Sequence, residues 1–167
     1  MTHWTIRREV RSAEIHYTVA WSPWGDMDRW VINRLVPSEA GLFQLWVSEG
    51  RGMVLLETEP TYYGGLRNSL REIIDELAPA GERLRKRIDG RECRFRFSVT
   101  PFRTYLEDLK QWFGGPGEAW DDDDREILVN EIESMKLFPP SPPDVAVKVR
   151  ERLKDVDFVP PLPRKPG

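Results

Sequence analysis

Cysteine is almost missing from this sequence, which contains only Cys93. One thiol cannot form an internal disulfide, so a disulfide-stapled scaffold is excluded and the fold does not depend on an oxidising compartment. Long apolar runs are missing too, since no stretch approaches the roughly 20 apolar residues that cross a bilayer. The first ten residues carry Arg7, Arg8 and Glu9 and lack the apolar centre of a signal peptide. We therefore expect a cytoplasmic protein without a membrane segment.

Several kinds of metal and nucleotide site are also missing. The only histidines, His3 and His16, have no cysteine or carboxylate cluster beside them in sequence, so we expect no zinc site. Gly64 and Gly65 lack the glycine-lysine signature of a phosphate loop. The run Asp121 to Asp124 lacks the alternation and the central glycine of a calcium loop.

The composition that is present indicates a globular chain. The apolar share of 40% and the charged share of 32% suit one ordinary core for 167 residues. We expect a single domain over residues 1–138. A proline spacer with a short helix would follow at 139–157, and a disordered proline-rich tail at 158–167. The tail segment 160–165, Pro-Pro-Leu-Pro-Arg-Lys, fits the pattern that SH3-type grooves accept.

Hydrophobic periodicity predicts an α+β fold, in which helices pack on a small, mostly antiparallel sheet. Strands are expected at 4–10, 14–21, 41–47, 53–58 and 93–99. The first two strands would form an N-terminal hairpin, and the next two form the clearest hairpin of the sequence. Helices are expected at 26–35, 66–77, 101–113, 121–137 and 144–156. In the fourth helix, the four aspartates would occupy the positive end of the helix dipole.

Charge is distributed unevenly along the chain. The segment 81–103 concentrates basic residues, namely Arg83, Arg85, Lys86, Arg87, Arg91, Arg94, Arg96 and Arg103. The segment 118–133 has eight acidic residues and only one basic residue, Arg125. The two segments could be solvated faces that pair with each other. Alternatively, the basic strip could bind the phosphates of a nucleic acid, although the net charge of -3 argues against a general nucleic-acid coat protein.

One ordered set of motifs extends over residues 36–113. Residues 36–43 place a proline and a short turn before Gly41-Leu42-Phe43 at the start of a strand. A hairpin then ends in Leu55-Leu56-Glu57, and Leu66-Arg67 opens a helix. The strand at 93–99 and a helix with Tyr105-Leu106-Glu107 complete the set. This order resembles the GIY-YIG nuclease domain, in which a hairpin, a helix with an arginine, a third strand and a helix with a glutamate follow one another.

The resemblance implies roles for six residues. The tyrosines of the family help to deprotonate the attacking water, and Phe43 occupies the first tyrosine position. The family arginine binds the scissile phosphate, which corresponds here to Arg67. The family glutamate binds Mg²⁺ or Mn²⁺, which corresponds here to Glu107. A later register, Tyr63-Gly64-Gly65, would make Arg71 the phosphate ligand, and Tyr62 or Tyr63 could fold back to replace the lost hydroxyl.

Three functional hypotheses follow from these patterns. The first is a GIY-YIG-like domain that contacts DNA or RNA with weak or lost cleavage, using the six residues and the basic strip. The second is a non-catalytic protein-interaction module that uses the acidic C-terminal helix and the aromatic surface. The third is a small-molecule domain with a pocket lined by Trp21, Trp24 and Trp30.

Overall fold

The computed structural model describes residues 4–115, 117–134 and 136–138. It divides the chain into one unit that ends at Lys136 and a second that begins at Leu137. The spacer, helix and tail expected beyond residue 138 lie outside the described residues. The strands are β1 (Ile6–Arg11), β2 (Glu14–Ala20), β3 (Trp24–Asp26), β4 (Gly41–Glu49), β5 (Gly52–Thr61), β6 (Cys93–Val99), β7 (Glu126–Ile132) and β8 (Leu137–Phe138). The helices are α1 (Arg29–Leu35), α2 (Gly65–Ile74), α3 (Glu82–Ile88) and α4 (Arg103–Gly114), with a 3-10 turn at Pro79–Gly81.

The larger sheet of the first unit contains the strands β5, β4, β6 and β3 in that order. The hairpin β4–β5 is antiparallel, as the sequence predicts, and β6 pairs antiparallel with the other side of β4. Phe43 lies opposite Phe97, and Leu45 lies opposite Phe95, so these side chains share one face. The apolar stripe of α2, formed by Leu66, Leu70 and Ile73 at helical spacing, is buried as well.

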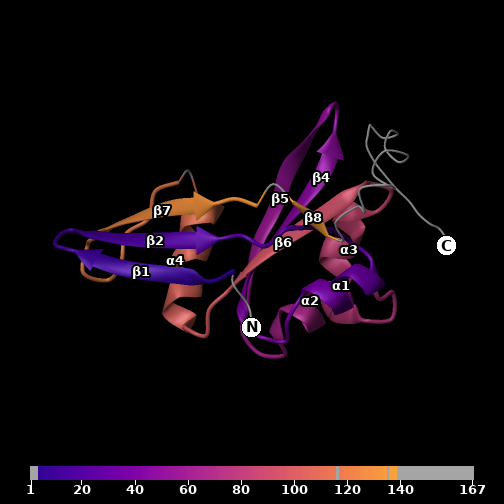
Figure 1. Cartoon of the computed structure of the whole chain (residues 1–167), viewed down its shortest axis with the longest axis horizontal. Helices are drawn as coiled ribbons and strands as arrows, with labels where there is room; N and C mark the ends of the chain where they lie inside the picture. Colours follow the sequence, from indigo (N-terminus) through magenta and orange to yellow (C-terminus); the bar gives the residue numbers. More distant parts are fainter. Residues whose placement is uncertain (1–3, 116, 135, 139–167) are drawn as a thin grey trace. The chain divides into compact units, whose positions relative to one another are not determined.

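The smaller sheet of the first unit contains the strands β1, β2 and β7. The hairpin β1–β2 is antiparallel and confirms the predicted N-terminal hairpin. Strand β7 pairs parallel with β2, so the sheets are mixed rather than purely antiparallel. The α+β class is confirmed. Figure 1 shows α4 beside this smaller sheet, whereas α1, α2 and α3 group beside the larger one.

A core cluster joins α4 to the smaller sheet. Ile15, Tyr17 and Val19 alternate along β2 and are buried, as their spacing predicts. Leu106 and Leu109 of α4 pack in the same cluster. Glu107 and Lys110, which directly follow these two leucines, are exposed on the other side of the helix.

The helix expected at 121–137 is wrong. Asp121 Oδ1 accepts hydrogen bonds from the backbone N–H groups of Asp123 and Arg125, which closes a turn instead of starting a helix. Asp124 takes a left-handed conformation with φ of 61°. Residues 126–132 then form β7, because pairing with β2 provides the backbone partners that a helix would have provided internally.

Other boundaries differ for local reasons. The first helix begins at Arg29 rather than at residue 26, because Asp28 caps it by accepting the N–H groups of Trp30 and Val31. The strand β3 is not among the strands that the sequence predicts; it forms because Gly25 pairs with Phe95 of β6. The second helix ends at Ile74 instead of residue 77. Helix α3 was not anticipated, and α4 runs two residues later at its start than expected.

Candidate functional site

Three side chains meet where the end of β5 passes the first turns of α4. Arg103 Nε lies 3.0 Å from Glu107 Oε2, one helical turn away. The guanidinium of Arg103 also covers the ring of Tyr62, with 4.6 Å between its Cζ atom and the ring centroid. The structure therefore brings Tyr62 close to Glu107. Arg103, which the sequence assigned to the nucleic-acid strip, lies between them.

The electrostatics of this group do not suit a hydrolytic site. Partial burial, and then the charge of Glu107, raises the pKa of the Tyr62 hydroxyl, which makes the tyrosinate form rarer. The Glu107 carboxylate already has a cation, Arg103, as its partner. No group of three His, Cys, Asp or Glu side chains able to hold a metal ion occurs within 4–115, 117–134 and 136–138. These residues do not fit the Mg²⁺ or Mn²⁺ ion that the resemblance implies.

The other residues that the resemblance assigns are dispersed. Phe43 is 3% exposed and lies opposite Phe97 in the sheet, so it cannot reach a substrate. Arg67 Nε donates a hydrogen bond to the Val36 carbonyl at 2.8 Å, which ties α2 to the end of α1. In the part of the chain that the structure describes, no hydrogen bond or ion pair joins Arg67 or Arg71 to Glu107.

Most residues of the predicted basic strip are engaged within the protein. Arg83 and Arg87 of α3 both reach Glu57 of β5. The remaining surface pairs are Lys86 with Glu82, Arg94 with Asp26 and Glu92, and Arg103 with Glu107. Arg91 is exposed. The strip is thus paired within the protein, but mostly with acids outside the segment 118–133. Among its described residues only Arg96 pairs with that segment, through Glu131 and Glu133, so the expected pairing of the two charged segments with each other is largely wrong.

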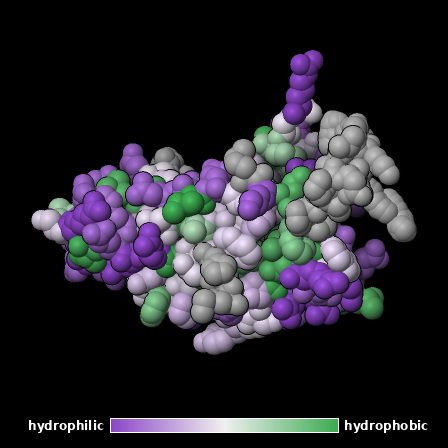
Figure 2. All heavy atoms as spheres, in the orientation of Figure 1, coloured by the Kyte–Doolittle hydropathy of each residue, from purple (hydrophilic) through white to green (hydrophobic). Residues whose placement is uncertain are grey.

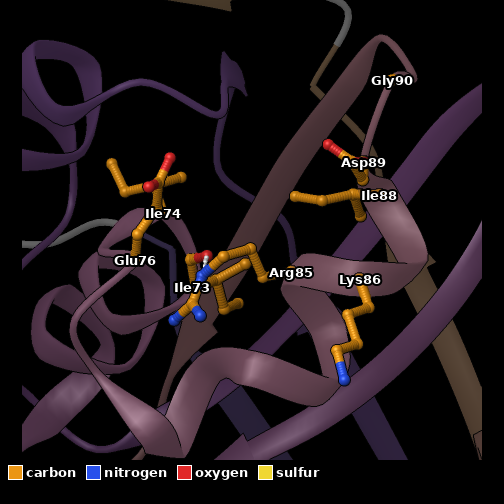
Figure 3. Close-up of a pocket in the computed structure, with 8 residues that line it drawn as sticks. All are labelled: Ile73, Ile74, Glu76, Arg85, Lys86, Ile88, Asp89 and Gly90. Carbon is orange, nitrogen blue, oxygen red and sulfur yellow. Dashed lines mark hydrogen bonds between the residues drawn. The ribbon is translucent and has the colours of Figure 1, made fainter.

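Arg85 of the strip caps the end of α2. Its Nε donates to the Ile73 carbonyl at 2.9 Å, and its Nη2 donates to the carbonyls of Glu72 at 2.9 Å and Ala78 at 2.6 Å. These carbonyls belong to the C-terminal end of a helix and the turn after it, where a cation is favourable. Arg85 also lines a hollow of about 440 Å³ together with residues of α2 and α3. Figure 3 shows its guanidinium beside Ile73. The Arg85 guanidinium thus stabilises the end of α2 and the turn that follows it.

Arg96 occupies a cage of tryptophans. It is 3% exposed, and its Cζ atom lies 4.6 Å, 4.7 Å and 5.3 Å from the ring centroids of Trp21, Trp24 and Trp46. Its Nε donates to Gln44 Oε1 at 2.9 Å, and its Nη1 lies 3.0 Å from Glu133 Oε1. Burial lowers the pKa of Arg96, and the charge of Glu133 opposes that shift.

The tryptophan cage corrects the pocket that the sequence suggested. Trp21 and Trp24 do converge, but Arg96 fills the space between them, and Trp30 lies on α1 instead. The sequence interpretation missed Trp46. Its alternation with Gln44 on β4 was a usable signal, because it places both side chains on the face of Arg94 and Arg96.

An aromatic group remains open to solvent around the start of α4. Tyr63 is 89% exposed and Phe102 is 55% exposed. The rings of Phe102 and Tyr105 lie 4.8 Å apart between centroids, and the Arg8 guanidinium lies 5.9 Å from the Tyr105 ring. We define the aromatic surface by five residues, which are Tyr62, Tyr63, Phe102, Arg103 and Tyr105.

Hydrophilic residues dominate the part of the molecule formed by β1, β2 and β7 in the view of Figure 2. No helix in the described ranges is long and apolar enough to cross a membrane.

No curated protein and no solved structure gives a significant match to the chain. Residues 5–166 match the model of a family described as "Uncharacterised protein", and the chain belongs to this family.

Proposed function

We propose that this chain is a non-catalytic protein-interaction module on a GIY-YIG-like scaffold, with the aromatic surface as its contact site. The observation that carries the proposal is the exposure of Tyr63 and Phe102 beside Arg103 and Tyr62. Aromatic residues and arginine are enriched at the energetic centres of protein interfaces. Their rings bury a large area and lose little rotamer freedom on binding.

The scaffold part of the proposal is supported by the order of the elements. The hairpin β4–β5, helix α2, strand β6 and helix α4 occur in the order that the resemblance implies, with α3 as an additional helix between α2 and β6. In the sheet, β4 is the strand between β5 and β6. The non-catalytic part is supported by the buried position of Phe43, the tethered Arg67 and the pairing of Glu107 with Arg103. A cytoplasmic location also belongs to the proposal, with the buried thiol of Cys93 as its support.

Nucleic-acid binding is the second candidate, and one observation favours it. Two guanidinium groups lie over tyrosine rings, Arg103 over Tyr62 and Arg8 over Tyr105. Proteins that bind single strands combine cations with aromatic rings on which bases stack. The internal pairing of the basic strip counts against this candidate, because few of those cations remain to release counterions from a phosphate backbone.

The experiment compares wild type with the double variant Tyr63→Ala/Phe102→Ala in a quantitative pull-down from cell extract. Leu77→Ala is the control, because Leu77 is equally solvent-exposed but lies in the turn after α2. We expect the same proteins with wild type and the control, and their loss with the double variant. Retention of every captured protein by the double variant would contradict the proposal.

A second arm addresses nucleic acid with labelled single-stranded and duplex DNA, with and without Mg²⁺ or Mn²⁺. On the protein-interaction proposal, neither DNA binds and neither is cut. Binding that weakens steeply with salt and disappears in the double variant would favour the second candidate instead. Metal-dependent cleavage that Glu107→Ala abolishes would overturn the non-catalytic assignment.

A further inference from the structure

Negative charge in surplus lies next to the aromatic surface. Asp108 is in the second turn of α4, beside Glu107 and one turn after Tyr105. Its carboxylate accepts a hydrogen bond from the buried Tyr17 hydroxyl. Asp121 and Asp122 are near enough to raise the pKa of Asp108 further, after the larger effect of burial. Ala119, two residues before the turn at 121–125, packs in one core cluster with Leu106 and Leu109 of α4. The turn therefore starts close to the helix that carries Phe102, Arg103 and Tyr105.

Half of the eight acids in the described segment 118–133 have no ion-pair partner. The only cation of the segment, Arg125, pairs with Asp121 and Asp123. The distal glutamates Glu131 and Glu133 are committed to Arg96. Across the described ranges, four further acids of the segment form no ion pair, namely Glu118, Asp122, Asp124 and Glu126.

Because unpaired carboxylates lie near the exposed aromatic rings, we infer that the partner of the aromatic surface is a basic protein segment. The inference rests on the proposed function and specifies the partner's chemistry. Apolar or aromatic side chains of the segment contact Tyr63 and Phe102, and its lysines or arginines face Asp122 and Asp124. Complementary charge of this kind steers association and selects among partners. The same carboxylates repel a phosphate backbone, which is why a peptide fits this surface better than a nucleic acid.

The test uses the full chain and measures fluorescence anisotropy of two labelled peptides. One short peptide alternates Phe and Pro with Lys and Arg, and the other has Glu in place of every Lys and Arg. We expect the basic peptide to bind, with an affinity that falls as salt is added, and the acidic peptide not to bind. Equal binding of both peptides, or no binding of the basic peptide at low salt, overturns the inference.

Two variants separate this inference from the proposed function. Asp122→Asn/Asp124→Asn removes the charges, and asparagine tolerates the left-handed conformation at position 124. We expect this variant to weaken binding of the basic peptide by about tenfold and to reduce its salt dependence. The matched control is Glu76→Gln/Asp89→Asn, which removes two exposed acids at the hollow between α2 and α3 and should bind as wild type does.

The outcomes can be told apart. If Tyr63→Ala/Phe102→Ala loses the peptide but the asparagine variant binds as wild type does, the basic partner is wrong and the interaction surface stands. If Tyr63→Ala/Phe102→Ala keeps full affinity for the basic peptide, both this inference and the proposed function are wrong. If single-stranded DNA displaces the basic peptide from wild type, a nucleic acid is the better occupant. A wild-type dimer that the alanine variant abolishes in light scattering would assign the surface to a second copy of the chain.

Discussion

Arg96 Nη1 of β6 lies 3.0 Å from Glu133 Oε1, so the larger sheet is joined by an ion pair to the chain that leaves β7. Glu131 reinforces the connection, because its carboxylate accepts a hydrogen bond from Trp21 Nε1 at 2.7 Å and lies 3.5 Å from Arg96 Nη2. A buried guanidinium without partners would be very costly. The cage therefore fixes where the segment after β7 must lie.

The first prediction concerns this cage. Arg96→Lys keeps the charge but loses the planar stacking on three indole rings and the fork toward two glutamates, so we expect about 2 kcal/mol lower free energy of unfolding. Arg96→Ala should cost about 4 kcal/mol, because it leaves a cavity and unpaired polar groups. Urea denaturation measures both values. Arg91→Lys is the control, since Arg91 is exposed, and an equal loss in that variant would contradict the prediction.

The second prediction concerns the close approach of α2 and the turn before α3. A Cβ atom at Gly81 would lie 2.0 Å from the Glu72 carbonyl oxygen, which is backbone and cannot move aside. We expect Gly81→Ala to lower the free energy of unfolding by about 3 kcal/mol or to prevent folding. Gly52→Ala is the control, because nothing lies within 4 Å of its added Cβ. Near-wild-type stability of Gly81→Ala would refute the packing argument.

The third prediction concerns the cap that Arg85 provides for α2. Arg85→Met keeps most of the apolar stem but removes hydrogen bonds to three backbone carbonyls. We expect a loss of about 2 kcal/mol in the free energy of unfolding. Lys86→Met removes only an exposed i,i+4 pair with Glu82 and should change stability by less than about 0.5 kcal/mol. Similar losses in the two variants would show that the cap contributes little.

Much of the fold was predictable wherever alternation or helical spacing was strong. The strand expected at 93–99 matches β6, because Phe95, Phe97 and Val99 alternate with polar residues and pair with β4. The acidic segment was misassigned because charge near a helix start and charge in an aspartate turn look alike in sequence. Only the hydrogen bonds of Asp121 and the pairing of β7 with β2 separate the two cases.

The candidate site was predictable in part. The resemblance directed attention to Tyr62 and Glu107, and the structure brings both into contact with Arg103. It could not reveal that Arg103 lies over Tyr62 and pairs with Glu107, because contacts between β5 and α4 depend on packing rather than spacing. The tryptophan cage shows the same limit, since Trp21, Trp46 and Arg96 come from three strands or strand ends distant in sequence.

The fourth prediction concerns the pH dependence of stability at Asp108. Burial raises the pKa of this carboxyl in the folded state, with a further rise from Asp121 and Asp122, while the Tyr17 hydroxyl and Arg8 lower it. A raised folded pKa means that the folded protein binds the proton more tightly than the unfolded chain. The stability contribution of Asp108 is therefore present below its unfolded pKa and is lost as pH rises through its folded pKa.

Asp108→Asn should remove this pH-dependent contribution to stability, while the asparagine side chain still accepts the hydrogen bond from the Tyr17 hydroxyl. We expect the free energy of unfolding of the variant, relative to wild type, to increase as pH rises from about 4 to about 7. Urea denaturation at several pH values measures the difference, and Asp89→Asn, at an exposed site, should give a curve parallel to wild type. A constant difference between Asp108→Asn and wild type across this range would mean that Asp108 has no raised pKa in the folded protein.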